Sequence, residues 1–454
     1  MTGTAPSAFH VMAKPTGAVC NLDCEYCFFL SKDQLYPGSD FRMNPEVHEA
    51  YIAQLLEAHT GPDEVVVAFQ GGEPTMMGLD FMRRTVELEE EHRRPGQTIL
   101  NTIQTNGTLL DDEWGEFLHE HRFLVGISID GPRALHDAYR VDKGGKPTFD
   151  RVLRGLEVLR RHGVDWNALT TVNAANGDHG REVYTFLRDD LGAEFVQLIP
   201  IVERVTAEQL PLAATGWGRR HGERPLYRQA GDLVTHRTVG AEQLGQFLVE
   251  VFEEWARHDV GDVFVQMFDT ALAHWMGLDQ VGMCVHARTC GSALALEHNG
   301  DLYACDHYVE EDYLLGNIRG GRPLLALATS PRQQEFGRAK LDSLPAQCLS
   351  CDVRFACNGG CPKDRFLTTS DGESGLHYLC AGYQRFFRHV DGPMKVMAAL
   401  LAQGADATGV REWYAARDAR RAPADPCPCG SGRGWADCHG APSDGGLKPV
   451  EARR

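Results

Sequence analysis

Short apolar runs alternate with amphipathic stretches from residue 13 to about residue 267. The runs are rich in Val, Ile and Phe and have the length of buried strands. They cover residues 65–69, 99–104, 123–129, 166–172, 194–199 and 263–268. The stretches between them have a helical period and cover residues 45–58, 80–92, 111–121, 149–162, 180–191 and 241–258. This alternation predicts an α/β fold whose parallel sheet forms a barrel or partial barrel, with its chemistry at the carboxyl ends of the strands.

Residues 201–240 interrupt this pattern. They contain proline, glycine and arginine without a clear period, which favours a loop insertion. Near the other end of the chain, residues 383–401 have a helical pattern with basic residues.

Composition and charge narrow the possible functions. The chain has 454 residues, enough for two or three domains, and a net charge of −18 without a long basic patch, so we expect no nucleic-acid partner. No apolar run approaches the roughly 18 residues of a membrane span, and residues 1–14 do not resemble a signal peptide. We therefore expect a cytoplasmic protein without a membrane partner.

The cysteines are strongly clustered. The chain has 14 of them, and none lies between residues 28 and 283. In a large chain without an export signal, close spacing indicates metal sites rather than disulfides.

The first cysteine group is Cys20, Cys24 and Cys27, with C-x3-C-x2-C spacing. Three thiolates can hold three irons of a four-iron cluster and leave the fourth iron without a protein ligand. A structural zinc site is the alternative, but zinc normally takes four closed ligands and no fourth Cys or His follows in the loop. The spacing favours a cluster with one iron open to a small molecule.

Polar, turn-forming motifs follow three of the predicted strands. The sequence QGGEP (70–74) follows the run 65–69 directly, and QTNG (104–107) and SIDGP (128–132) close the next two runs. Glycines let the backbone approach a ligand, and the exposed carbonyls can accept from an ammonium group. A tight turn without a ligand is the alternative for QGGEP.

Asp269 ends the last apolar run. It precedes a helical pattern, so one interpretation is a helix N-cap. A carboxylate surrounded by Phe264, Met267 and Phe268 would also have a raised pKa, which suits a proton acceptor.

Two further cysteine groups follow. The larger one could form two closed four-thiolate sites, for which the spacing leaves iron–sulfur clusters and zinc ribbons both possible. It comprises Cys284, Cys290, Cys305, Cys348, Cys351, Cys357, Cys361 and Cys380. The last group, Cys427, Cys429, Cys438 and His439, supplies three sulfurs and one nitrogen, a normal set for tetrahedral zinc. A disordered Gly/Pro tail with incidental cysteines is the alternative reading there.

The segments CNLDCEYCFF, AFQGGEPT, QTNGTL and VGISIDGP together resemble the anaerobic sulfatase-maturating enzymes of the radical S-adenosylmethionine superfamily. The resemblance covers residues of about 10–200 and 262–390. Residues 348–362 resemble the SPASM domain of peptide-modifying radical enzymes, and the tail resembles the SEC-C motif. One departure is Phe29, where the family often carries a tyrosine close to the substrate.

The resemblance implies an architecture. We expect a partial (β/α)6 barrel over residues 1–270 with the irregular insertion at about 201–240, and a SPASM domain over 271–395. A helical linker over 396–422, a zinc knuckle over 423–442 and a tail over 443–454 would follow. The implied cofactors are S-adenosylmethionine, three [4Fe-4S] clusters and a Zn²⁺ ion in the knuckle.

It also implies roles for the residues. Cys20, Cys24 and Cys27 would hold the open cluster. The turn Gly71, Gly72, Glu73 and Pro74 would hold the methionine amino group, Ser128 would contact the cofactor, and Gln70 would lie near the reacting centre. One auxiliary cluster would take Cys284, Cys290, Cys305 and Cys361, and the other Cys348, Cys351, Cys357 and Cys380. Asp269 aligns with the general base of the family.

The implied reaction is oxidation of an active-site cysteine or serine of a sulfatase to Cα-formylglycine. A 5′-deoxyadenosyl radical would remove a β-hydrogen, Asp269 would take the proton, and the auxiliary clusters would accept the second electron. The partners would be the sulfatase polypeptide and an electron donor such as a flavodoxin or ferredoxin. Two alternatives stay open: a SPASM enzyme that cross-links a ribosomal peptide, and a non-enzymatic zinc-ribbon binding protein.

Overall fold

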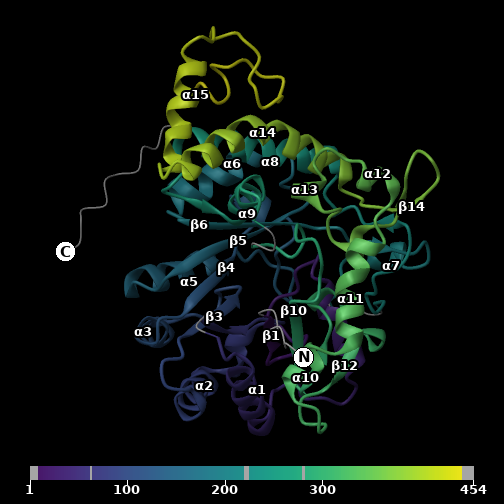
Figure 1. The fold of residues 1–454 in the computed structure, drawn as a ribbon. Helices are drawn as coiled ribbons and strands as arrows, with labels where there is room; N and C mark the ends of the chain where they lie inside the picture. The colour runs from purple at the N-terminus through teal and green to yellow at the C-terminus, as the bar shows by residue number, and fades with distance from the viewer. Residues whose placement is uncertain (1–8, 62–63, 219–223, 279–281, 442–454) are drawn as a thin grey trace.

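The computed structural model describes residues 9–61, 64–218, 224–278 and 282–441. Ten strands form one sheet in the order β12-β11-β10-β1-β2-β3-β4-β5-β6-β9 (Figure 1). Neighbours from β10 to β9 pair in parallel, and β11 and β12 pair antiparallel at one edge. The strands are β1 His10–Lys14, β2 Val65–Phe69, β3 Ile99–Thr105, β4 Leu124–Ser128, β5 Trp166–Val172, β6 Phe195–Pro200, β9 Phe264–Val265, β10 Ala293–Glu297, β11 Asp301–Tyr303 and β12 Leu314–Asn317.

Helices follow the parallel strands and pack their apolar faces against the sheet in one core. These are α1 Pro45–Ala58, α2 Leu79–His92, α3 Asp112–Glu120, α4 Arg133–His136, α5 Phe149–His162, α6 Gly180–Thr185, α8 Ala241–His258 and α9 Gln266–Trp275. The predicted helix start at residue 45 is confirmed, because the Asn44 side chain accepts a hydrogen bond from the Val47 N–H at 2.9 Å and Pro45 follows. The predicted helix over 180–191 continues beyond α6 as a π-helical turn, Phe186–Asp190.

The predicted strand over 263–268 is confirmed only at Phe264 and Val265. β9 has two residues, and α9 begins at Gln266 after Val265, the N-cap residue. Asp269 therefore lies in the first turn of α9 and is not its N-cap. Phe268 is buried and stacks on Phe386, with ring centroids 5.6 Å apart. The apolar run is thus part of a buried helix, which periodicity over six residues does not distinguish from a strand.

β1 was missed by the sequence analysis because its apolar run is short and ends in Lys14. That lysine is nevertheless buried, since its ammonium group forms an ion pair with Asp306. β1 pairs with β2 on one side and with β10 on the other. The cysteine-rich half of the chain therefore continues the barrel sheet.

The described parts of the predicted insertion, residues 201–218 and 224–240, have little regular structure but enclose their own core. Their elements are β7 Arg204–Val205, α7 Leu210–Ala213 and β8 Leu233–Val234. Val205, Ala213, Trp217 and Tyr227 form a buried cluster. Lys32 donates to the Tyr227 carbonyl at 2.7 Å. The segment expected to be an irregular loop insertion thus packs against the chain that follows the first cysteine group.

The C-terminal half is mainly helical and joins the same core. Its elements are α10 Leu324–Ala328, α11 Pro331–Asp342, α12 Ala346–Leu349, α13 Arg354–Cys357, β13 Leu367–Thr368, β14 Ser374–Leu376, α14 Cys380–Ala402 and α15 Val410–Asp418. α14 crosses α8 closely, because a Cβ atom at Gly245 would lie 2.9 Å from the Gly382 Cα atom. Within the described ranges, none of the helices combines the length and apolar character needed to cross a bilayer.

Candidate metal and cofactor sites

The first cysteine group lies in the loop after β1, at the carboxyl ends of the parallel strands. Cys24 is buried, and Cys20 and Cys27 are partly buried. Burial raises the pKa of all three thiols, that of Cys24 to about 12. Without a positive charge beside them these thiols would stay protonated, so the loop fits a cationic iron centre that stabilises the thiolate form.

A buried ion pair anchors this loop to β4. Tyr26, between two of the cysteines, donates a hydrogen bond to Asp130 Oδ2 at 2.6 Å, and Arg140 Nε lies 3.0 Å from the same oxygen. All three side chains are buried. No local sequence pattern assigns a role to any of the three. The sequence does contain one hint, because Asp130 directly follows an apolar strand pattern. An aspartate buried at that position requires a cation or several hydrogen-bond donors.

The turn after β2 lies directly against the residues that lead into Cys20. The Gly72 N–H donates to the Gly17 carbonyl at 2.8 Å, and the Glu73 N–H donates to the Val19 carbonyl at 3.1 Å. A Cβ atom at Gly72 would lie 1.9 Å from that Val19 oxygen, so only glycine fits there. The structure thus brings the predicted cofactor turn and the predicted cluster loop together.

The side chain of Glu73 is occupied within the protein. Its buried carboxylate accepts hydrogen bonds from the Thr75 N–H at 3.0 Å, the Thr105 hydroxyl at 2.7 Å and the Asn106 N–H at 2.8 Å. Burial raises the pKa of Glu73, and these hydrogen bonds oppose the shift. Glu73 therefore ties the end of β2 to the end of β3, and the backbone of the turn is what remains for a ligand.

The face of the sheet that carries Ser128 is exposed to solvent along β6. Ser128 Oγ accepts from Gln104 Nε2 at 3.0 Å, and a Cβ atom at Gly126 would collide with Gln104. Ser128 pairs with Leu169, which pairs with a residue of β6, so alternate residues of β6 face the same side. Phe195, on that side of β6, is 46% exposed. Exposed apolar side chains on this face leave room for a nucleoside or a peptide.

Gln70 and Asp269 follow two different strands of the parallel sheet. Gln70 follows β2 and is partly exposed, with its N–H bonded to the Ala13 carbonyl at 2.9 Å. Asp269 lies on α9, which follows β9 at the far edge of the sheet. Its carboxylate has no hydrogen-bond or ionic partner among the described residues, and burial alone raises its pKa to about 6. An unpaired carboxyl group with that pKa can accept a proton near neutral pH.

The eight cysteines of the second field form two spatial groups. Negative charge on Cys361 and Cys284 raises the pKa of Cys305, after the larger effect of burial. In the other group burial raises the pKa of Cys357 to about 12, and Cys380, Cys348 and Cys351 add to the shift. That second group lines one cavity together with His377 and Gln384. The four thiols of the second group thus surround one space, as the ligands of a cluster must.

The C-terminal group is more compact. The ligand atoms of Cys427, Cys429, Cys438 and His439 all lie within 4.8 Å of one another. Such spacing matches a single tetrahedral ion, because Zn–S bonds of about 2.3 Å place two sulfurs roughly 4 Å apart. His439 Nε2 is 3.0 Å from the Glu250 carbonyl, so it can donate there and leave Nδ1 for a metal. The knuckle therefore contacts α8 through this carbonyl; in Figure 1 it is the yellow loop that follows α15.

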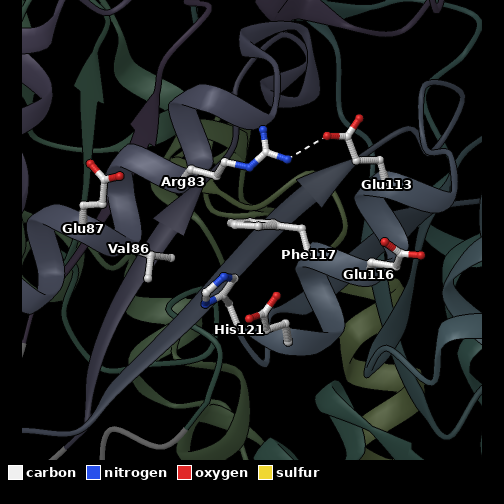
Figure 2. A pocket seen from close by; sticks show the side chains of 8 residues that line it. Arg83, Val86, Glu87, Glu113, Glu116, Phe117 and His121 are labelled. Atoms are coloured by element: carbon white, nitrogen blue, oxygen red, sulfur yellow. Dashed lines mark hydrogen bonds and ion pairs between the residues drawn. The ribbon is translucent and has the colours of Figure 1, made fainter.

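A separate surface cavity of about 360 Å³ lies between α2 and α3 (Figure 2). Its residues include Arg83 and Glu113, which form an exposed ion pair at 2.7 Å. None of the predicted site residues lines it. We therefore assign it no part in the chemistry of the cysteine sites.

Comparison with known families agrees with these groups. The family described as the Radical SAM superfamily matches residues 15–187, and an iron–sulfur cluster-binding domain family, SPASM, matches residues 284–352. The SEC-C motif family matches residues 424–441. These matches include the first cysteine loop, the start of the second cysteine field and the compact C-terminal group.

Individual relatives cover most of the chain. A serine-type anaerobic sulfatase-maturating enzyme of Bacteroides thetaiotaomicron is 45% identical over 399 residues, which span 87% of this chain and 93% of the relative. A cysteine-type enzyme of Clostridium perfringens is 30% identical over 84% of this chain and 95% of the relative. The solved structure described as native anSMEcpe with bound AdoMet and Cp18Cys peptide is similar with a TM-score of 0.72, at 29% identity, over 86% of this chain and 99% of that one.

The close contact at Gly72 gives a test of the turn. We expect Gly72→Ala to destabilise the protein by about 2–3 kcal/mol, because the added methyl group forces the turn away from the Val19 carbonyl. Gly240→Ala is the control. Gly240 has a φ of −67°, which alanine adopts without strain, and an added Cβ would meet only the Gln243 side chain, at an ordinary distance of 3.6 Å. Denaturant unfolding under anaerobic conditions measures both, and equal stabilities of the two variants would contradict the contact.

Proposed function

The chain belongs to the anaerobic sulfatase-maturating enzymes, and from that premise we propose that it oxidises a cysteine or serine of a sulfatase to Cα-formylglycine. The observation that carries the proposal is the contact between the QGGEP turn and the cysteine loop, together with an exposed sheet face along β6. Cross-linking of a ribosomal peptide is not supported, because these close relatives are named sulfatase-maturating enzymes. A purely structural zinc-ribbon role would leave the turn and the exposed face without a purpose.

The residues of this chain would hold the cofactors as follows. Cys20, Cys24 and Cys27 would ligate one [4Fe-4S] cluster, and the backbone of Gly71 and Gly72 would accept from the methionine ammonium group of S-adenosylmethionine. Ser128 would contact the nucleoside part. When bound together, the cluster and S-adenosylmethionine would supply a 5′-deoxyadenosyl radical that takes a hydrogen atom from the β-carbon of the substrate. The exposed face at Phe195 gives the substrate peptide access.

Asp269 would remove the proton in the second half of the oxidation. After loss of one hydrogen atom, the substrate carbon must release one electron, and its thiol or hydroxyl must release one proton, to form a thioaldehyde or aldehyde. Water then converts a thioaldehyde into formylglycine with release of hydrogen sulfide. The unpaired, partly buried carboxylate of Asp269 is suited to take that proton, and Gln70, at the end of β2, would lie near the reacting carbon.

The two auxiliary four-cysteine groups would hold the second and third clusters. All ligands there come from the protein, so these sites suit electron transfer rather than substrate binding. They would receive the electron released by the substrate, while an electron donor such as a flavodoxin or ferredoxin would reduce the first cluster. The compact C-terminal group would hold one zinc ion. The grouping of the cysteines in sets that suit metals rather than disulfides supports a reducing, cytoplasmic location.

The reaction itself is tested with peptides. Anaerobically reduced enzyme is incubated with S-adenosylmethionine and a sulfatase-type peptide that carries either cysteine or serine. We expect formation of 5′-deoxyadenosine together with a peptide mass loss of about 18 Da for cysteine or about 2 Da for serine. Two peptides are needed because the reported relatives include both named types. Rapid cofactor cleavage with both peptides unchanged would rule out the proposal.

The pKa of Asp269 predicts a pH dependence. A base must be deprotonated, so peptide oxidation should rise with pH up to about 6 and level off above about 7. Asp269→Asn should reduce peptide oxidation at least 100-fold and remove this pH limb, with cofactor cleavage close to that of the parent. Asp262→Asn is the control, because Asp262 is exposed and paired with Arg411. An unchanged product yield in Asp269→Asn would remove this residue from the mechanism.

Metal analysis tests the assignment of the cysteine groups. We expect about one zinc per chain together with about twelve irons. Cys438→Ser should lose the zinc and keep the iron, and Cys357→Ser should lose about four irons and keep the zinc. Loss of iron in Cys438→Ser, or zinc bound in place of iron throughout, would show that the groups are assigned wrongly.

A further inference from the structure

The two auxiliary groups are joined by a short segment with unusual backbone geometry. Cys357 belongs to one group and Cys361 to the other, and Asn358, Gly359 and Gly360 connect them. These three residues have φ angles of 48°, 72° and 62°, all in the left-handed region. Three consecutive left-handed residues turn the chain tightly, which two glycines and an asparagine tolerate.

The guanidinium of Arg365 lies within this turn. It donates to the carbonyls of residues 358, 359 and 360 at 3.0, 2.8 and 3.2 Å. It also donates to the Lys340 carbonyl at 2.6 Å and the Ser343 hydroxyl at 3.4 Å. Every one of these acceptors is neutral. A planar group with five donors is thus fixed between the two cysteine groups.

Lys340 is a second cation in the same region. It lies on α11 with a fully buried side chain, and it donates to the carbonyls of Cys284 and Val285 at 2.7 and 2.8 Å and to that of Ala287. Throughout the described ranges, neither Lys340 nor Arg365 forms an ion pair with a carboxylate. Buried cations normally have an anionic partner, because desolvation of an unpaired charge is costly.

The thiols are the anions within reach. Burial lowers the pKa of Arg365, and negative charge on cysteines of both groups opposes that shift: Cys348, Cys290, Cys361 and Cys357. For Lys340, the opposing charges come from the first group only: Cys290, Cys361 and Cys284. The hydrogen bonds agree with this difference: Arg365 bonds the turn that joins Cys357 of one group to Cys361 of the other, whereas Lys340 bonds the carbonyl of Cys284 in the first group.

We propose that Arg365 is a charge-compensating residue shared by both auxiliary sites, and that Lys340 is its counterpart for the first site alone. One-electron reduction of a site ligated by four thiolates adds one negative charge, and a fixed cation nearby stabilises that reduced state. The two side chains thereby favour acceptance of the electron released by the substrate carbon. This inference deepens the proposed function and relies on it only for the source of that electron.

The test is a potentiometric titration of full-length, reconstituted enzyme followed by electron paramagnetic resonance. Cys20, Cys24 and Cys27 are replaced by alanine so that only the auxiliary sites give signals, and no peptide or S-adenosylmethionine is added. Failure of the peptide reaction therefore does not affect this result. Iron and sulfide contents equal to those of the parent show that each variant retains both sites.

Arg365→Gln should lower the equilibrium constant for reduction of both sites about tenfold, equivalent to about 59 mV for one electron. Lys340→Gln should do so for the first site only. Arg365→Lys keeps the charge but not the five-donor geometry, and its values should stay within about threefold of the parent. Arg388→Gln is the control: this arginine acts on Cys380 but is 55% exposed and paired with Asp352, so solvent should screen it.

Three results would overturn the inference. Parental potentials in Arg365→Gln would show that the charge has no effect. Equal shifts in Arg365→Lys and Arg365→Gln would show that hydrogen bonding to the turn, rather than charge, is what matters. If Arg365→Gln loses iron, the other two variants provide the test. A first-site potential equal to that of the parent in Lys340→Gln would contradict the inference. A tenfold lower equilibrium constant for reduction in Arg365→Lys would contradict it as well.

Discussion

The desolvation of cysteine thiols is the constraint on which the rest of this structure depends. Burial raises the pKa of thiols in each of the first two cysteine fields, to about 12 for Cys24, Cys357 and Cys361. Thiols in such surroundings become thiolates only beside positive charge, which metal centres and nearby cations supply. The fold therefore makes sense as a scaffold that places metal sites at fixed positions along one sheet.

The sheet connects the sites physically. β1 leads into the first cysteine loop and pairs with β10, whose region carries the auxiliary cysteines. Buried ion pairs between Lys14 and Asp306 and between Lys32 and Glu310 cross the same boundary. Because these contacts are buried, the loop that would bind the cofactor and the domain that would accept electrons form one packed unit. This arrangement suits a reaction in which a hydrogen atom and then an electron leave one carbon.

Much of the fold could be predicted from the sequence wherever a local pattern of apolar and polar residues specifies the element. The helices over 45–58, 149–162 and 241–258 have the predicted bounds, because their amphipathic period is complete and their ends carry ordinary caps. The run at 263–268 was too short for periodicity to separate a strand from a buried helix. The strand β1 could not be predicted, because Lys14 is a charged residue at the end of a short apolar run. Its burial depends on an ion pair with Asp306, almost 300 residues later in the chain.

The candidate site also has a part that could be predicted from the sequence and a part that could not. The ligand sets followed from cysteine spacing and family resemblance, whereas their electrostatic surroundings did not. Tyr26 meets Asp130, and Arg365 meets the turn between two cysteine groups, through contacts that no local pattern encodes. The buried carboxylate of Glu73 is a similar case, since two of its hydrogen-bond donors, Thr105 and Asn106, come from the end of the next strand.

The proposed function requires that the cluster at Cys20, Cys24 and Cys27 keeps one iron open to S-adenosylmethionine while the other sites are closed. Electron paramagnetic resonance of anaerobically reduced, full-length protein, recorded with and without S-adenosylmethionine, is the decisive measurement. We expect one cluster signal to change on addition of the cofactor, this signal to be missing in Cys24→Ala, and the remaining signals to stay the same. Spectra in which no signal responds to the cofactor would show that no iron is open to it.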